Sequence, residues 1–369
     1  MSRTPVSSTL RKERRRAGLS QAALAHRVGV SRQAIVAIEA GKQVPGTDLA
    51  LNLARALSCS VEDLFHLETQ PSTVHATMAE AGEPSSKRVV LGRVLGRWVA
   101  HPVSSHTQAA HGVTGSGSGS GGRIEPLTAA RHFEDNLLVA GCAPLLGLLA
   151  QRSRSPRGDL AASWIPRGSV GALGLLDAGL VHMAGVHFED SGPGALDDLI
   201  RSHLAGQPWQ TVTLTRWRQG LAVPKGNPLA VRTPEDLLRP GLRFAHRERG
   251  AVAHQLLTRF VEGAGGRPED ITGPTASGHL AVAHAVAMGA ADTGITIEAA
   301  ALSRGLDFVP LSEERFDLVL RPQQATEKTT EAFLNLMVDG AFRRDAGALG
   351  GYDLSQTGRR RDFEPAPAA

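Results

Sequence analysis

The feature that most constrains the fold is an alternation of strand-like and helix-like segments between residues 136 and 320. Short runs of β-branched and other apolar residues are followed by longer runs whose apolar positions recur at helical spacing. This order is typical of α/β domains, in which helices connect mostly parallel strands and cover both faces of the sheet. We expect strands at 136–141, 160–165, 180–186, 211–217, 221–224, 242–246, 292–295, 307–311 and 317–320.

The first 68 residues show a different pattern, of short amphipathic helices with capping residues. A Ser or Thr precedes each of four apolar-periodic runs, where its side chain can accept a free backbone N–H of the first turn. Residues 60–63 match a capping box with Asp in place of Glu. The predicted N-caps are Ser20, Ser31, Thr47 and Ser60, and the predicted left-handed C-caps are Gly18, Gly29 and Gly41. We therefore expect roughly five helices around one small core.

The remaining segments have weaker patterns. Residues 69–87 are polar and rich in Pro, Ser and Ala, which is typical of a linker. Within 88–125, residues 88–99 are strand-like, and residues 106–123 form a Gly/Ser-rich stretch that predicts a mobile loop. The chain is thus divided into a helical domain at 1–68, these two segments, an α/β domain at 126–348 and a frayed tail at 349–369.

Positive charge is concentrated at the N-terminal end of the chain. Residues 1–69 contain ten Lys and Arg against six Asp and Glu, which accounts for the whole net charge of +4. The rest of the chain is balanced. A basic module joined to a neutral body predicts a head that binds a polyanion.

Cysteine usage and hydropathy exclude several classes of protein. Cys59 and Cys142 are the two cysteines, so a disulfide framework is excluded and a reducing compartment is indicated. The N-terminal residues contain no apolar core of a signal peptide, and no run of 18 apolar residues occurs. We therefore expect a cytoplasmic protein without a membrane partner.

Residues 19–42, LSQAALAHRVGVSRQAIVAIEAGK, resemble the helix-turn-helix of the phage repressor/Cro (XRE) family, and the resemblance extends over 8–68. The small Ala25 permits a close crossing of two helices, and Gly29 supplies the positive φ of the turn. The resemblance implies that a helix from about Arg32 to Ala40 enters the major groove of double-stranded DNA. It also implies a homodimer on a two-fold symmetric operator.

The same resemblance assigns roles to individual residues. Arg32, Gln33 and Ala37 would face base edges, since Arg favours guanine and Gln favours adenine. A phosphate would be held at the helix start by Gln21, and Lys42 would add nonspecific attraction together with the basic residues at 11–16. Arg14 matches the position that pairs with Glu39 in this family. The implied DNA-contacting set is Gln21, Ser31, Arg32, Gln33, Ala37 and Lys42.

Several motifs in the second part of the chain resemble the periplasmic-binding-protein-like domain that is fused to helix-turn-helix or molybdopterin-biosynthesis modules. They are GCAP at 141–144, GS at 168–169, HMAGVH at 182–187, RERG at 247–250, ADTG at 291–294 and EAAA at 298–301. The resemblance covers 136–320 and implies the type II periplasmic-binding-protein-like fold. That fold has two α/β lobes joined by crossover strands, with the ligand in the cleft between them.

The resemblance implies an oxyanion effector such as molybdate or tungstate. Helix N-termini and serine hydroxyls at the strand-to-helix junctions suit a tetrahedral anion without requiring net charge. Residues 251–254, AVAH, lack a hydroxyl and a positive charge found in related domains, so a small organic metabolite is the alternative effector and a degenerate pocket the third interpretation. The implied ligand-binding set is Cys142, Ala143, Ser169, Arg249, Gly250, Ala251, His279 and Glu298.

The histidines, Cys142 and Glu298 each have more than one conceivable role. His182 and His187 are five residues apart, as are His279 and His284, a spacing that does not place both rings on one helical face; no metal site and no cofactor are predicted. A thiol such as that of Cys142 at a helix start can sense oxidants, but a small buried residue lining the cleft is the favoured interpretation. Glu298 is expected to cap the hinge or to hold the cleft shut through Arg249.

The combined features indicate a one-component transcriptional regulator. Motifs of nucleophilic, zinc-dependent or nucleotide-dependent enzymes do not occur, so an enzyme is not expected. A solute receptor of a transporter is the third class; the basic head and the missing leader weigh against it. We expect binding of effector to change the geometry of paired heads on DNA.

Overall fold

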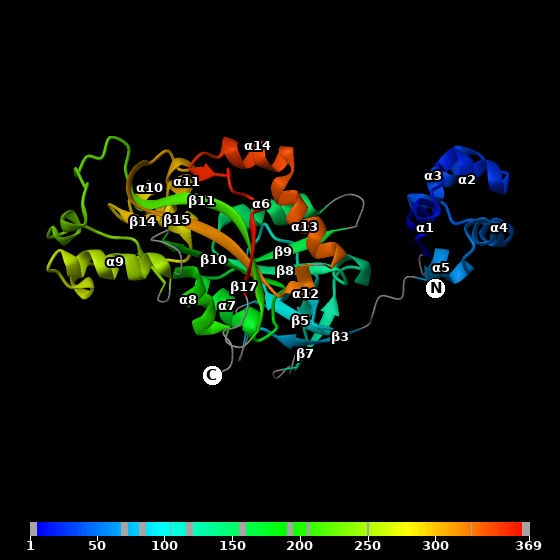
Figure 1. The fold of residues 1–369 in the computed structure, drawn as a ribbon, viewed down its shortest axis with the longest axis horizontal. Coiled ribbons are helices and arrows are strands. Elements are labelled where there is room, and N and C mark those ends of the chain that lie inside the picture. Colours follow the sequence, from blue (N-terminus) through cyan, green and yellow to red (C-terminus); the bar gives the residue numbers. More distant parts are fainter. Residues whose placement is uncertain are drawn as a thin grey trace. The chain divides into compact units, whose positions relative to one another are not determined.

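The computed structural model describes residues 6–67, 73–80, 86–103, 105–115, 121–154, 160–189, 195–204, 207–248, 251–325 and 327–363. The chain forms two compact units, Met1–Ser72 and Thr73–Ala369, which we call the head unit and the body unit (Figure 1). Within the described ranges, the helices are all too short or too polar to cross a membrane.

The head unit is a small helical domain, as predicted. Six side chains with no exposed surface form its centre: Leu10, Leu24, Ile35, Ile38, Leu53 and Leu64. A short antiparallel pair of strands joins the two ends of the unit. Its elements are β1 (Val6–Ser8), α1 (Leu10–Arg16), α2 (Gln21–Val28), α3 (Arg32–Glu39), α4 (Thr47–Leu57), α5 (Val61–Leu64) and β2 (Phe65–Leu67).

Local capping residues explain where these helices begin and end. Ser20 and Ser31 each accept a backbone N–H of the following first turn, and Ser60 forms the predicted capping box with Asp63. Gly29 ends α2 in the left-handed conformation with φ 71°, as predicted. The prediction for Thr47 is wrong: Thr47 is the first residue of α4, and the N-cap is the residue before it.

The body unit begins with a closed barrel that the sequence analysis did not predict. Its strands follow the order β3-β5-β4-β6-β7 around the barrel. They are β3 (Val74–Met78), β4 (Arg88–Val94), β5 (Arg97–Pro102), β6 (Gly112–Thr114) and β7 (Gly121–Pro126). Residues 69–87 are therefore not only a linker, since β3 lies within them. The predicted loop at 106–123 includes β6 and the start of β7, while its residues 116–120 lie outside the described ranges.

Glycines that look like loop residues in the sequence are required by the packing of this barrel. A Cβ atom at Gly112 would lie 2.5 Å from Ile124 Cγ2 and 2.9 Å from the carbonyl oxygen of Glu125. A Cβ atom at Gly122 would lie 2.7 Å from the sulfur of Met78. Glycine at these positions marks a close approach of strands rather than a flexible segment.

A central sheet of eight strands forms the rest of the body unit. Its main path is β14-β11-β15-β10-β8-β9. Among the described strands of this sheet, only the β8–β9 and β8–β10 pairs are parallel, so the expectation of a mostly parallel sheet is wrong. The strands are β8 (Asn136–Gly141), β9 (Ala161–Pro166), β10 (Met183–Glu189), β11 (Trp209–Val223), β14 (Gly294–Ile297) and β15 (Asp307–Leu320).

Two long antiparallel strands connect the lobes of the α/β fold. The runs predicted separately at 211–217 and 221–224 form one strand, β11, and those at 307–311 and 317–320 form β15. These strands pair along their length, with register shifts between Thr213 and Thr215 and between Gln219 and Gly220. They pass from the first lobe, built on β8, β9 and β10, to the second lobe, built around β14 (Figure 1).

Helices pack against the sheet in both lobes (Figure 1). The first lobe has α6 (Pro144–Ser153), α7 (Ser169–Asp177) and α8 (Ala195–His203). The second has α9 (Val252–Gly263), α10 (His279–Ala287) and α11 (Glu298–Leu302), with the parallel strands β12 (His246–Arg247) and β13 (Thr275–Ala276). Later helices are α12 (Pro322–Ala325), α13 (Lys328–Val338) and α14 (Gly340–Ala348), and the 3-10 helices are Ala130–His132, Pro234–Leu238 and Pro268–Asp270.

The C-terminal segment is part of the sheet rather than a frayed tail. Strands β16 (Tyr352–Asp353) and β17 (Arg360–Phe363) both pair with β11. Phe363 is 9% exposed and packs in the core of the first lobe. The prediction of a tail from 349 is therefore wrong up to residue 363, and residues 364–369 lie outside the described ranges.

Candidate functional site

The helix α3 presents the residues predicted to read DNA. Arg32 and Gln33 lie exposed in its first turn, directly after the N-cap Ser31, and Ala37 is half-buried one turn further on. Beyond the helix, Lys42 is exposed. Cationic side chains at 11, 12, 15 and 16 on α1 are exposed as well. The head unit therefore combines an open polar helix start with a cationic surface, an arrangement that suits contact with a phosphate backbone.

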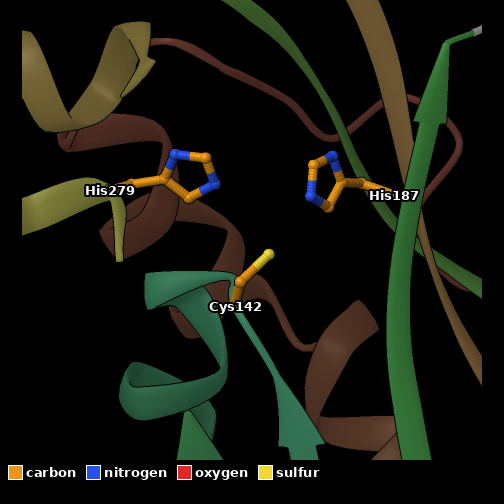
Figure 2. A group of neighbouring side chains, drawn as sticks. All are labelled: Cys142, His187 and His279. Carbon is orange, nitrogen blue, oxygen red and sulfur yellow. The ribbon is translucent and has the colours of Figure 1, made fainter. Parts of the chain in front are cut away.

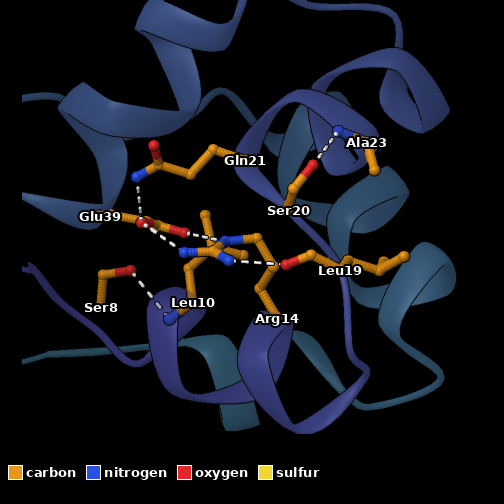
Figure 3. Close-up of polar contacts among 8 residues, drawn as sticks. All are labelled: Ser8, Leu10, Arg14, Leu19, Ser20, Gln21, Ala23 and Glu39. Carbon is orange, nitrogen blue, oxygen red and sulfur yellow. Dashed lines mark hydrogen bonds and ion pairs between the residues drawn. The ribbon is translucent and has the colours of Figure 1, made fainter.

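A buried ion pair fixes the orientation of α3 within the head unit (Figure 3). Arg14 donates from Nε to Glu39 Oε1 at 2.5 Å and from Nη2 to Oε2 at 3.2 Å, and the two side chains are 8% and 4% exposed. The third donor of Arg14, Nη1, reaches the carbonyl of Leu19 at 2.7 Å. The predicted pairing of Arg14 with Glu39 is confirmed, and it ties α1 to the end of α3.

Gln21 takes part in the same network. Its Nε2 donates to Glu39 Oε2 at 2.9 Å (Figure 3). Burial by itself raises the pKa of Glu39, but Arg14 and Gln21 outweigh that effect and lower it. One side of the Gln21 amide is thus committed to the protein interior, and a phosphate contact by this residue stays a prediction.

In the body unit, three side chains from different elements converge between the lobes (Figure 2). Cys142 lies between β8 and α6, His187 lies on β10, and His279 is the first residue of α10. The Cys142 sulfur and one ring nitrogen of each histidine all lie within 4.8 Å of one another. The three residues are 7%, 2% and 1% exposed, respectively.

A buried carboxylate holds His187 in place. His187 Nδ1 lies 2.7 Å from Glu314 Oε2 on β15, and the same oxygen accepts the Trp217 Nε1–H at 3.0 Å. Burial by itself lowers the pKa of His187, but electrostatic interactions and hydrogen bonds with Cys142 and Glu314 raise it to about 10. In turn, burial raises the pKa of Glu314, and His187 outweighs that effect and lowers it.

His279 has a different environment. Its Nδ1 lies 3.2 Å from Arg247 Nη1, and because a guanidinium can only donate, Nδ1 acts as the acceptor. The other ring nitrogen, Nε2, is buried and has no hydrogen-bond partner among the described residues. Arg247 also donates from Nε and Nη2 to Glu248, both at 2.8 Å. Burial, followed by Arg247 and His187, lowers the pKa of His279 well below its usual value.

The other residues of the predicted ligand set are placed as follows. Ser169, at the start of α7, accepts the backbone N–H of His187 at 3.1 Å, so it supports the cluster from behind. Ala143 and Ala251 are the N-cap residues of α6 and α9. Arg249 and Gly250 lie outside the described residues.

Glu298 pairs with a residue of a crossover strand. Arg218 on β11 donates to it, with Arg218 Nε 2.9 Å from Glu298 Oε2, whereas the predicted partner Arg249 lies outside the described residues. Arg218 and Glu298 line a surface pocket of about 300 Å³ together with Trp217 and Tyr352. Glu298 therefore links α11 to a crossover strand.

Four residues in or next to this cluster are absent from the predicted ligand-binding set: His187, Glu314, Trp217 and Arg247. His187 was paired with His182 along the chain, although its partners are distant in sequence. His182 instead binds backbone atoms, with Nδ1 accepting the N–H of Leu138 at 2.9 Å. The sequence signal that could have located the site is the position of Cys142 and His279, because both lie at the start of a helix that follows a strand.

Comparisons with known proteins identify both units. A family model for the PBP superfamily domain matches residues 150–338, and a helix-turn-helix model matches residues 10–64. The uncharacterized protein YvgK of Bacillus subtilis is 29% identical over 196 residues, which are 52% of this chain and 63% of YvgK. The chain thus spans less than two thirds of that relative.

Two further similarities concern one unit each. An uncharacterized HTH-type transcriptional regulator of Methanothermobacter thermautotrophicus is 47% identical over 64 residues, 17% of this chain and 93% of that protein. Among solved structures, an ABC-type phosphate transport receptor from Vibrio cholerae has a TM-score of 0.40 at 13% identity, over 59% of this chain and 99% of that chain.

Proposed function

Because this chain belongs to the PBP superfamily and carries a helix-turn-helix at residues 10–64, we propose that it is a one-component transcriptional regulator that binds a small effector between its two lobes. The proposed partner of the head unit is a double-stranded operator. We further propose that the chain acts as a cytoplasmic homodimer, because one short recognition helix makes few base contacts and a two-fold operator doubles them.

The observation that carries this proposal is a buried polar cluster between the lobes in a chain that also exposes the polar start of α3. Cys142, His187 and His279 come from three elements of the two lobes and are nearly fully buried. Groups of this kind are costly to bury without partners. Nε2 of His279 has no hydrogen-bond partner in the part of the chain that the structure describes, which supports a ligand at this place.

Regulation would follow from a preference of the effector for one arrangement of the lobes. A ligand shifts an equilibrium only by its difference in affinity for the two states. The crossover strands β11 and β15 belong to both lobes, so a change in lobe angle must be accommodated in them.

Molybdate or tungstate is the effector that the resemblance implies, with a small organic metabolite as the alternative. The N-termini of α7 and α10, the Nε2–H of His279 and the guanidinium of Arg247 support an anion. However, Arg247 is already neutralised by Glu248, and His187 is paired with Glu314, so neither offers an uncompensated positive charge to an anion. A second candidate, a metal cation, is favoured by the Cys/His/His cluster and is developed below.

Operator selection with the full-length chain tests the regulator proposal. The selected site should be bound specifically, and replacing both Arg32 and Gln33 by Ala should remove base preference. The Lys42→Ala variant should instead weaken binding to all sequences and lower the salt dependence by about one counterion. A footprint that the double substitution leaves unchanged would contradict the recognition-helix assignment. Absence of any preferred site would refute the regulator itself.

A further inference from the structure

We propose that Cys142, His187 and His279 form a binding site for a thiophilic transition-metal cation such as Zn²⁺ or Cu⁺. The site consists of one sulfur and two imidazole nitrogens that face one another between the lobes (Figure 2). A regulatory role of the cation rests on the proposed function, whereas the binding site itself does not.

The donor set matches the ligand chemistry of these cations. Thiolate selects Zn²⁺ and Cu⁺, and imidazole binds both ions. Ligand atoms around one Zn²⁺ lie about 3.5 Å apart, given Zn–N near 2.0–2.1 Å and Zn–S near 2.3 Å. The limit of 4.8 Å between the three donor atoms here requires only a small contraction. Three protein ligands leave a fourth position open for water or a small ligand.

The surroundings of His187 are those of a metal ligand. Its Nδ1 is hydrogen-bonded to Glu314, so the other ring nitrogen is the one available toward Cys142 (Figure 2). A carboxylate behind a histidine fixes the ring and increases its donor strength in many metal sites. Glu314 is itself held by Trp217 and is 2% exposed, so the orientation of the ring is well defined.

The charged groups around the cluster are paired with one another. Arg247 and Glu248 form an ion pair and cancel each other. His187 is paired with Glu314, whose side chain also accepts the Trp217 Nε1–H and is influenced by the charge of Arg259. A divalent anion would therefore find no uncompensated positive charge, whereas a cation bound at His187 takes the place of the ring proton as the charge that compensates Glu314.

His279 provides the second observation. Among the described residues its buried Nε2 has no hydrogen-bond partner, and it points toward His187 and Cys142 (Figure 2). Binding a cation at Nε2 moves the ring proton to Nδ1, which then loses its contact with Arg247. Arg247 therefore opposes a cation and supports an anion. This opposition makes Arg247 the residue that separates the two candidate effectors.

Titration of the full-length chain with Co²⁺, followed by competition with Zn²⁺, tests the site. One Co²⁺ per chain should bind with a thiolate charge-transfer absorption, and excess Zn²⁺ should remove that absorption. Cys142→Ser and His279→Gln should weaken binding by more than about 100-fold, and Glu314→Gln by about 10- to 100-fold, the range for groups behind a ligand. Far-ultraviolet circular dichroism verifies that each variant is folded.

The chain offers matched controls for both ligand types. Cys59→Ser changes the other cysteine, which lies in the head unit, and His284→Gln changes an exposed histidine on the same helix as His279. Neither should alter Co²⁺ binding. Absence of stoichiometric binding, binding without thiolate absorption, or equal binding by Cys142→Ser and Cys59→Ser would overturn the proposal.

The Arg247→Gln variant distinguishes cation from oxyanion. It should bind Co²⁺ as tightly as the native chain or more tightly. If native protein is instead stabilised by molybdate, and Arg247→Gln removes that stabilisation while Co²⁺ does not bind, the effector is an anion and the metal proposal is wrong. Operator binding is measured separately, so loss of the metal site and loss of the regulator function are distinct results.

Discussion

The substitution Glu39→Ala should unfold or nearly unfold the head unit while the body unit stays folded. Alanine leaves the guanidinium of Arg14, whose side chain is 8% exposed, with only the carbonyl of Leu19, and removes the acceptor of Gln21. Breaking a buried ion pair from one side costs about 3–5 kcal/mol. At about 0.05–0.15 kcal/mol per residue, the 72 residues of the head unit have a total stability of about 4–11 kcal/mol. The loss is therefore a large part of the total.

Hydrogen exchange and tryptophan fluorescence observe the two units separately. Exchange of backbone amides in peptides from 10–39, measured by mass spectrometry on the full-length chain, reports the opening free energy of α1, α2 and α3. All four tryptophans lie at positions 98, 164, 209 and 217, so their fluorescence during urea unfolding reports the body unit alone. We expect faster exchange in the head with an unchanged fluorescence midpoint.

The matched control is Glu13→Ala. Glu13 pairs with Arg16 at 3.5 Å, but the Arg16 side chain is 81% exposed, and such surface pairs contribute less than about 1 kcal/mol. Replacing Arg14 by Met together with Glu39 by Leu should recover most of the protection, since an apolar pair leaves no buried charge. Equal exchange rates in Glu39→Ala and Glu13→Ala would refute the reasoning.

Three further outcomes concern the body unit. Burial lowers the pKa of His101 and of His182 to about 4, so the unfolded chain binds more protons than the folded chain between pH 6.5 and 4. The free energy of unfolding should therefore fall as the pH drops through this window, by about 1.4 kcal/mol per pH unit for each histidine. Urea midpoints measure this loss. A flat profile from pH 6.5 to 4 would contradict this. Gly220→Ala should cost about 1–3 kcal/mol, because its Cβ would lie 2.1 Å from the carbonyl oxygen of Val309. Gly174→Ala, inside α7 with open space around it, should instead stabilise by about 0.5–1 kcal/mol, and the same sign for both glycines in thermal unfolding would rule out the packing explanation.

The head unit could be predicted from sequence because its determinants are local. The N-cap serines 20, 31 and 60 lie within three residues of the amides that they bind, so their spacing is visible in the chain. The pairing of Arg14 with Glu39 is not local, and it was available only through the family resemblance.

The barrel and the sheet order could not be predicted in this way. Gly112 and Gly122 are typical of loops by composition, and only the contacts with Ile124 and Met78 show why strands need them. Similarly, the antiparallel crossover strands appeared as separate short runs because polar residues occur where each strand passes between the lobes.

The cluster of Cys142, His187 and His279 shows that functional residues, too, cannot be found from local sequence patterns alone. Cys142 and His279 were among the predicted ligand-binding residues, but His187 was judged by its spacing to a neighbour in sequence. Its actual neighbours are 45 and 92 positions away, and Glu314 is further still. A short-range pattern carries no information about such a set, because only the order of strands in the sheet brings its members together.

The long strand β11 has one continuous neighbour, β15, and three short ones on its other edge. Trp209–Val212 pair with β17, Arg216 and Trp217 with β16, and Gln219–Ala222 with β14. One register shift against β15 lies between the first two of these stretches, and the other lies at the start of the third. We expect bending of β11 to be concentrated at these two irregularities. The lobes would then rotate about two defined axes, because the well-paired stretches between the irregularities stay straight.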